Sequence, residues 1–263
     1  MKKITKCLSV AVLFLSSNIV SFGQHKTKEL SPVIEIGANG SGFLYQGDLS
    51  DKPYGNFKDM HLGGGLYVKY YISPTFAVRA NYYQGELSGN DADFQEEWRQ
   101  KRAYKFWSPL SEFSIMGEAD LFGRRKFASY ILDAPHSQRW SVYANLGVGV
   151  AFVNAQRDWS KMDRSYFRLD APDRIEQDST NKPDRVVFVI PAGLGIRYDL
   201  SKHVSVFAEA GYRFTFTDNL DGYKYSVFSA KYDCYTTYSL GFCLRFHSKK
   251  MYDQVWEEMQ LRR

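Results

Sequence analysis

Cysteine is scarce in this sequence, with three in 263 residues. Cys7 lies ahead of a short apolar segment near the N-terminus, and Cys234 and Cys243 fall nine residues apart on one predicted strand. At about 3.3 Å per residue, a strand separates those two by roughly 30 Å. That separation excludes a disulfide bond between them.

Signature motifs of enzymes and cofactor sites are also absent. The sequence has no P-loop, no dinucleotide-binding fingerprint and no CxxC or HExxH metal spacing. Its five histidines are scattered over termini, strand ends and turns: His25, His61, His136, His203 and His247. Ser111 and Ser114 lie near Glu112 and can be imagined with His61, but no spacing enforces such a site. The sequence therefore predicts a protein that is not an enzyme, with no catalytic residues, cofactor or metal.

A strong charge of either sign is missing as well. Residues 1–23 contain three of the 34 Lys and Arg residues and none of the 29 Asp and Glu residues. Without them the balance is 31 minus 29, a net charge of +2. A nearly neutral chain gives no general reason to expect nucleic acid as a partner.

The N-terminal segment has a basic start, an apolar centre from Leu8 to Leu15, and small or polar residues before Gln24. This pattern predicts a secretory signal peptide over 1–23, with a membrane anchor as the alternative. We expect the mature chain to comprise a β-barrel over 24–246 and a periplasmic C-terminal tail over 247–263.

Alternation with period two is clearest between Arg185 and Phe214, where a polar turn over 199–203 separates two strands. One face of the first strand is apolar: Phe188, Ile190, Ala192, Leu194, Ile196 and Tyr198. The other face of this hairpin carries glycine, arginine and glutamate, a mixture expected of a crowded polar lumen. The pattern favours a barrel with lipid outside, and a soluble barrel with its apolar face inside is the alternative.

Similar alternation recurs along the rest of the chain. Eight strands are predicted, over 33–41, 61–72, 76–83, 109–121, 140–153, 185–198, 204–214 and 235–246. Short connections alternate with long ones, which cover roughly 42–60, 84–108, 154–184 and 215–234. This is the pattern of an all-β, eight-stranded antiparallel transmembrane β-barrel with long extracellular loops, located in the outer membrane.

The predicted lumen face holds nearly equal numbers of opposite charges. They are Glu35, Glu112, Glu118 and Glu209 against Lys69, Arg79, Arg197, Arg213 and Arg245. We expect them to pair, because unpaired ions out of water cost several kcal/mol each. An eight-stranded barrel is just wide enough for its own side chains, so we expect a plugged lumen, which weakens a porin interpretation.

Two loop stretches follow the first and seventh predicted strands. The first contains Gly47, Asp48 and Leu49, and the second contains Thr217, Asp218, Leu220 and Asp221. In a closed barrel the eighth strand pairs with the first, so these loops should be near neighbours. The convergence of Asp48, Asp218 and Asp221 leaves a calcium site open, although turn-forming Asp is the commoner explanation.

The order of four short segments resembles the PorG family, outer-membrane barrels of the type IX secretion system of Bacteroidetes. The segments are Glu35–Gly37, Tyr45–Leu49, Ser108–Phe113 and Phe216–Asp221. The resemblance implies a non-enzymatic barrel that ties the periplasmic PorK and PorN ring to the outer membrane. The family usually has an aromatic residue where Asn219 stands and a second acidic residue where Gly222 stands. These departures leave room for a paralogue with another partner.

Two periplasmic surfaces are candidates for such contacts. Arg124 and Arg125 make a basic turn, and Met251, Val255 and Met259 form an apolar stripe at helical spacing, beside Trp256. The stripe predicts a short helical tail that docks on a partner, or else lies on the membrane surface or frays. The alternative function is a small porin-like or surface ligand or adhesion barrel that acts through its extracellular loops.

Overall fold

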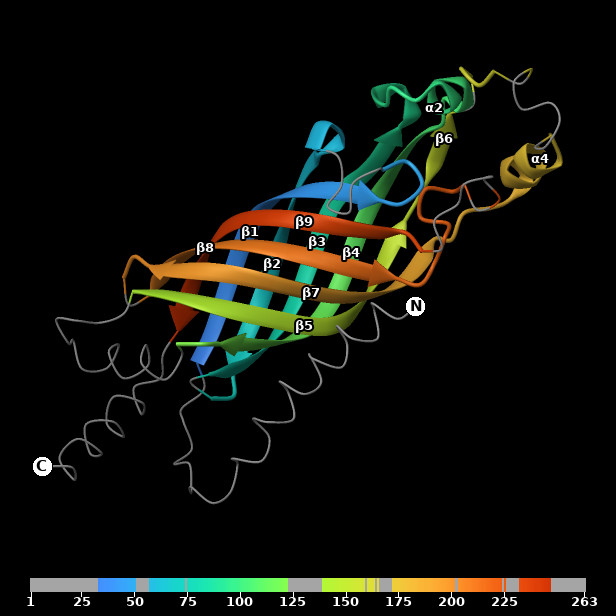
Figure 1. Cartoon of the computed structure of the whole chain (residues 1–263). Coiled ribbons are helices and arrows are strands. Elements are labelled where there is room, and N and C mark those ends of the chain that lie inside the picture. The colour runs from blue at the N-terminus through green and yellow to red at the C-terminus, as the bar shows by residue number, and fades with distance from the viewer. Residues whose placement is uncertain are drawn as a thin grey trace, which may run out of the picture. The chain divides into compact units, whose positions relative to one another are not determined.

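The structure is a computed structural model that describes residues 33–50, 57–73, 75–122, 139–158, 160–163, 165, 172–201, 203–223, 225 and 232–246. Eight long strands form the barrel (Figure 1): β1 Val33–Gln46, β2 His61–Tyr71, β3 Phe76–Asn90, β4 Lys105–Asp120, β5 Trp140–Val153, β7 Val186–Asp199, β8 Val204–Thr215 and β9 Cys234–Phe246. The connections carry the short strand β6 Gln156–Asp158, the helices α2 Glu97–Arg102 and α4 Pro172–Thr180, and the 3₁₀ turns η1 Phe57–Asp59 and η2 Asp91–Asp93. The predicted signal peptide and C-terminal tail lie outside the described residues.

The eight long strands close into an antiparallel barrel, which confirms the predicted fold. They pair in the order β3-β2-β1-β9-β8-β7-β5-β4, and β4 pairs again with β3. The first and last strands meet along thirteen residue pairs, from Ile34 opposite Phe246 to Gln46 opposite Cys234. Closure leaves these strands with hydrogen-bonding neighbours on both sides, as a barrel in lipid requires. No helix in the described part of the chain is long and apolar enough to cross a membrane.

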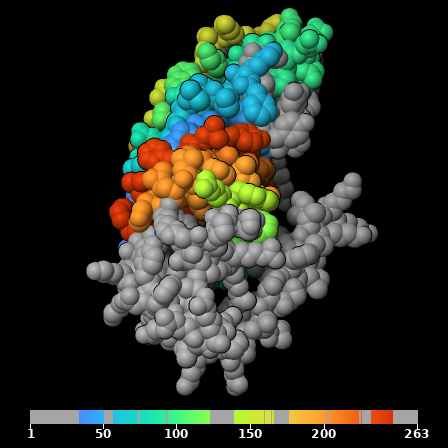
Figure 2. Space-filling view, turned by 90° about the vertical axis from the view of Figure 1, so that its left-hand side faces the viewer, coloured from blue at the N-terminus to red at the C-terminus, as the bar shows by residue number. Residues whose placement is uncertain are grey.

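The apolar face of the sheet points outward. Leu194 is 65% exposed and Leu240 is 71% exposed, whereas the charged Arg197 is 2% exposed. The space-filling view shows β7, β8 and β9, in orange and red, side by side on this outer wall (Figure 2). An apolar exterior around a charged interior is the reverse of a soluble barrel, so the soluble alternative is wrong and the barrel is of the transmembrane type.

Aromatic side chains border the apolar wall at two levels. The level near the short turns holds Tyr70, Phe76, Trp140, Tyr198 and Phe246, and the other holds Phe57, Tyr82, Phe113, Phe152, Phe188, Phe214 and Tyr238. Along β7, Phe188 and Tyr198 are separated by ten residues, or ~33 Å of strand. At a tilt of ~40° this covers ~25 Å of membrane, the usual height of the apolar band. Tyr71 and Tyr83, which adjoin Tyr70 and Tyr82 in the sequence, point into the lumen instead.

The long-loop end departs from the sequence prediction. Residues 42–46 and most of 84–108 were expected as loop, but β1 runs to Gln46, β3 to Asn90, and β4 starts at Lys105. The β3–β4 hairpin therefore rises about eight residues, or ~26 Å of strand, beyond Tyr82 and Phe113. Its tip carries α2 and its β4 arm pairs with β6, at the top of Figure 1.

Polarity explains why this extension was missed. In the projecting part of β3 the outward residues are polar, as at Glu86 and Ser88, while Leu87 is fully buried inside. On β4, Phe106 and Leu110 likewise point inward. The apolar face changes sides where the strands leave lipid for water, so a pattern that follows only the lipid-facing residues stops at the membrane boundary.

Candidate functional site: a filled lumen under a capped mouth

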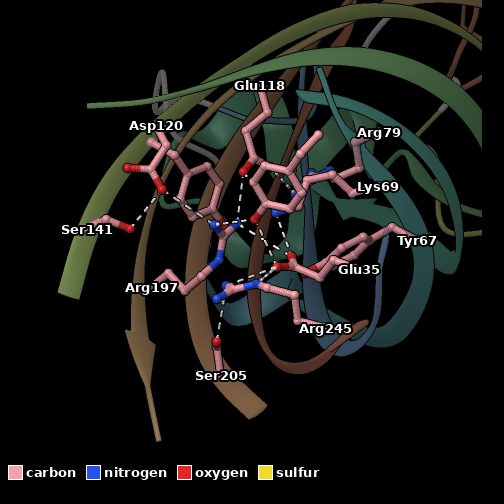
Figure 3. A network of polar contacts seen from close by, with 12 residues as sticks. Glu35, Tyr67, Lys69, Arg79, Glu118, Asp120, Ser141, Arg197, Ser205 and Arg245 are labelled. Atoms are coloured by element: carbon pink, nitrogen blue, oxygen red, sulfur yellow. Dashed lines mark hydrogen bonds and ion pairs between the residues drawn. The ribbon is translucent and has the colours of Figure 1, made fainter. Parts of the chain in front are cut away.

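The nine predicted lumen charges all point into the barrel and are at most 7% exposed. They come from seven of the eight barrel strands, and β5 supplies none. In chain order they are Glu35 on β1, Lys69 on β2, Arg79 on β3, Glu112 and Glu118 on β4, Arg197 on β7, Glu209 and Arg213 on β8, and Arg245 on β9. Members of this set and their polar neighbours are directed toward one another from the wall (Figure 3): Glu35, Lys69, Arg79, Glu118, Arg197 and Arg245. The period-two pattern placed them on one face, and barrel closure brings them together.

Glu35 and Glu118 lie at the centre of the cluster near the short turns. Glu118 Oε1 accepts from Lys69 Nζ at 3.0 Å and from Arg197 Nη2 at 2.8 Å. Glu35 Oε2 lies 3.2 Å from Arg245 Nη2, and its Oε1 forms an ion pair with Lys69. Each carboxylate thus faces more than one cation, which makes this cluster a network.

A second level of pairs lies closer to the long loops. Arg79 donates from Nη1 and Nη2 to the two oxygens of Glu209 at 2.8 and 2.9 Å. Arg213 Nε donates to Glu112 Oε2 at 3.1 Å, and the same oxygen accepts from Tyr235 Oη at 2.9 Å. The two-pronged Arg79–Glu209 pair has the geometry that fixes side chains most firmly.

Several members of the network were not predicted. Asp120 lies 3.6 Å from Arg197 Nη1, and Asp199 lies 3.6 Å from Arg245 Nη2. Tyr67 and Tyr71 donate to the two oxygens of Glu35 at 2.8 and 2.9 Å. Asp199 was assigned to the turn over 199–203, whereas Asp120 lies inside the predicted strand 109–121 but was not counted among the lumen charges.

Glycines on neighbouring strands mark the positions of the aromatic side chains that cross the lumen. Four lumen aromatics each stand directly across from a glycine on the neighbouring strand: Tyr67 from Gly37, Tyr83 from Gly65, Tyr143 from Gly195 and Phe207 from Gly241. A Cβ on Gly37 would lie 2.2 Å from Tyr67 Cε1. The glycines therefore make room for rings that cross the lumen, and rings and ion pairs together fill it.

The two motif loops meet over the opposite mouth of the barrel. Leu49 and Leu220 are both buried in one apolar cluster with Tyr104 and Tyr223, whose rings stack at 4.2 Å between centroids. Thr217 Oγ1 donates to Asp184 Oδ2 at 2.8 Å. These contacts make the loops a cap on the lumen.

Tyr45, at the end of β1, holds the two loops together. Its Oη lies 2.8 Å from Asp221 Oδ2 and 2.6 Å from Asp233 Oδ1. A Cβ on Gly47 would lie 2.0 Å from Tyr45 Oη and 2.1 Å from Asp233 Oδ1. Gly47 of the family motif is thus required by close approach to this cluster.

The acidic residues of the cap are engaged with protein donors. The backbone N–H of Tyr223 donates to Asp221 Oδ1 at 2.8 Å, and that of Leu220 donates to Asp233 Oδ2 at 2.9 Å. Within the described ranges, no group of three or more His, Cys, Asp or Glu residues has a metal-holding arrangement. The turn-forming explanation accounts for Asp221, and Asp233 was missed because it lies twelve residues beyond the end of the motif.

A buried ion pair fastens the tip of the β3–β4 hairpin to the first loop. Arg102 donates from Nε to Asp91 Oδ2 at 2.7 Å and from Nη2 to Asp91 Oδ1 at 2.9 Å. The same Nη2 lies 3.3 Å from the carbonyl oxygen of Asp48. Neither Asp91 nor Arg102 was predicted, because both lie in the stretch 84–108 that was expected to be a loop, where no pattern indicates a buried pair.

The remaining candidate residues fall into two groups. Ser114 donates to Glu112 inside the lumen at 3.0 Å, whereas His61 contacts Glu86 and Ser88 outside it, so these residues form no common site. Arg124, Arg125, Met251, Val255, Trp256 and Met259 lie outside the described residues.

Solved structures that are similar to this chain are outer-membrane proteins with low sequence identity to it. Ail of Yersinia pestis, solved in complex with the heparin analogue sucrose octasulfate, is 13% identical with a TM-score of 0.43 over 82% of this chain and 100% of its own. Neisserial surface protein A is 12% identical with a TM-score of 0.41 and covers 81% of this chain and 97% of its own. OprG of Pseudomonas aeruginosa is 11% identical with a TM-score of 0.40 and covers 84% of this chain and 98% of its own. At these values none of them lends this chain a function.

Comparison with curated proteins gives no match. A family model described as "Domain of unknown function (DUF6089)" matches residues 12–241, which include every barrel strand except the last part of β9. The chain therefore belongs to the DUF6089 family.

Proposed function

We propose that this protein is a non-enzymatic outer-membrane barrel that anchors or assembles a type IX secretion complex through its periplasmic face. The short turns and both chain ends of the barrel lie at one end, which is the periplasmic end in barrels of this kind. The resemblance of the motif segments to the PorG family supports PorK- and PorN-like ring proteins as the partners.

The observation that carries this proposal is the filled lumen. Five cationic side chains, six carboxylates including Asp120 and Asp199, and the crossing tyrosines occupy the interior. A barrel whose interior is a packed ion network is suited to being a rigid anchor. Because the interior is filled, other molecules can contact this protein only on the outer surfaces of the barrel and on its loops and turns.

Recovery of ring proteins tests the proposal. We expect the tagged chain, pulled down from detergent-solubilised envelopes, to bring PorK- and PorN-like proteins with it, as identified by mass spectrometry. Deletion of residues 251–263 should reduce that recovery while the barrel stays heat-modifiable on gels. Lys101→Ala, on α2 at the opposite end, is the control and should leave recovery unchanged. Recovery of the barrel alone would contradict the proposal.

The second candidate function, a surface ligand or adhesion barrel, is favoured by the projecting β3–β4 hairpin. Its outward residues above the membrane, such as Glu86 and Ser88, are polar, and its inner side is packed against the cap. A rigid ledge of this kind can present a binding surface outside the cell. It would become the leading candidate if the pull-down recovers the barrel alone.

A porin-like barrel should conduct ions across a bilayer, whereas a barrel with a filled lumen should not. We expect the purified chain in planar bilayers to show no steady conductance, because paired ions and rings occupy the lumen. The double variant Arg79→Ala/Glu209→Ala removes one whole ion pair and should allow measurable current. Steady conductance steps from the unaltered chain would show instead that the lumen is open.

A further inference from the structure

The contacts of Tyr45 require more hydrogen atoms than the residue owns. Its hydroxyl lies at hydrogen-bond distance from two carboxyl oxygens, Asp221 Oδ2 and Asp233 Oδ1. A phenol has one O–H hydrogen, and an ionised carboxylate only accepts. One of the two contacts therefore needs a hydrogen from the carboxyl group itself.

The surroundings of the cluster favour retention of that proton. Asp221 and Asp233 are each 1% exposed. Burial raises the pKa of Asp221 to about 6. Burial, with the negative charge of Asp221 beside it, raises the pKa of Asp233 well above its usual range.

The other ionisable groups that face the cluster come from four segments. They are Asp48 after β1, Asp218 and Tyr223 in the same loop as Asp221, Arg102 of α2 with Tyr104 just before β4, and Arg157 of β6. Of the two cations, Arg102 binds Asp91 through two hydrogen bonds, and Arg157 donates to the carbonyl oxygens of Gly222 and Asn181. Two ionised carboxylates at Tyr45 would therefore lack a dedicated counter-ion among these neighbours.

We propose that Tyr45, Asp221 and Asp233 share one extra proton and form a proton-dependent latch that holds the extracellular cap over the barrel mouth. With the proton, both contacts of Tyr45 are hydrogen bonds and the pair carries one negative charge. Without it, two buried carboxylates repel each other and one contact to Tyr45 is lost. This inference does not depend on the secretion function.

The direction of the pH effect follows from linkage. The closed cap binds more protons than the open one, in which the aspartates titrate normally near pH 4. Its stability is therefore greatest at low pH and falls as pH rises from about 4 through the raised pKa values. A rise of about two pKa units corresponds to a change of about 100-fold in the opening equilibrium.

Hydrogen exchange of the full chain in detergent tests the latch. After correction for the intrinsic pH dependence of exchange, we expect protection of amides in 217–223 to fall on the order of 100-fold between about pH 4 and pH 8. Asp233→Asn carries a fixed amide donor and no charge, so its protection should vary little with pH. Asp218→Asn removes a charge that contributes to the raised pKa of Asp221 but leaves Tyr45, Asp221 and Asp233 in place, so most of the fall should remain.

Three results would overturn the proposal. They are protection that is independent of pH in the unaltered chain, an unchanged fall in Asp233→Asn, or an equal loss of the fall in Asp218→Asn. Carbon NMR of aspartate-labelled, unaltered protein gives an answer even if a variant fails to fold. We expect at least one carboxyl carbon to titrate at or above about pH 6, and titration of all of them below pH 5 would refute the shared proton.

Discussion

Replacement of Glu35 with glutamine should lower the free energy of unfolding of the barrel by about 3–5 kcal/mol. Glu35 is fully buried and faces Lys69, Arg197 and Arg245 while it accepts hydrogen bonds from two tyrosines. Glutamine keeps the size of the side chain but removes the charge, which leaves cations in the lumen without an adequate counter-charge. Urea unfolding of the protein refolded into lipid vesicles measures the difference.

Glu86→Gln is the matched control for this experiment. Glu86 Oε1 lies 3.3 Å from His61 Nδ1, and both side chains are more than a third exposed. Exposed charged pairs contribute about 0–1 kcal/mol, so this change should hardly alter the free energy of unfolding. A loss below about 1 kcal/mol for Glu35→Gln as well would mean that the lumen screens its charges as water does, contrary to a filled interior.

Replacement of Leu194 with arginine should destabilise the barrel by about 2–4 kcal/mol in a bilayer. Leu194 points outward near the middle of β7, between the aromatic levels marked by Phe188 and Tyr198, and is 65% exposed. A guanidinium there has to enter the hydrocarbon region. The same unfolding assay in lipid vesicles gives the size of the effect.

Leu200→Arg supplies the comparison on the same segment. Leu200 follows the end of β7 and is 55% exposed, but it lies beyond Tyr198, at the membrane interface. Charged residues near the interface cost about 0–1 kcal/mol. Equal, small effects at both positions would contradict a lipid-facing wall, because arginine on a water-facing wall is well tolerated.

The sequence was sufficient for the membrane-spanning part of the fold. In the Arg185–Phe214 hairpin, one face is apolar and the other carries Gly, Arg and Glu, a pattern that favoured a lipid exterior and a polar interior over a soluble barrel. Because side chains alternate strictly along a strand, this face assignment also placed all nine lumen charges inside. The same local pattern located the short connections between β2 and β3 and between β7 and β8.

The sequence was not sufficient to predict the strands beyond the membrane boundary, where the exterior of the barrel changes from lipid to water. Above the membrane the exterior is water, so Leu87 and Phe106 turn inward and the polar residues turn outward. A strand in water and a loop then have similar polarity along the chain, and the extensions of β1, β3 and β4 were predicted as loops. The Asp91–Arg102 pair that fastens the hairpin tip was hidden for the same reason.

Alternation therefore determined which residues face the lumen and which face lipid, because that choice depends on neighbours along one strand. The tertiary structure alone decided which of these residues meet. Tyr45 and Asp233 are 188 residues apart, and Glu35 and Arg245 are 210 apart. Pairing of the first strand with the last brings both pairs together, and no local feature of the sequence encodes the register at which a barrel closes.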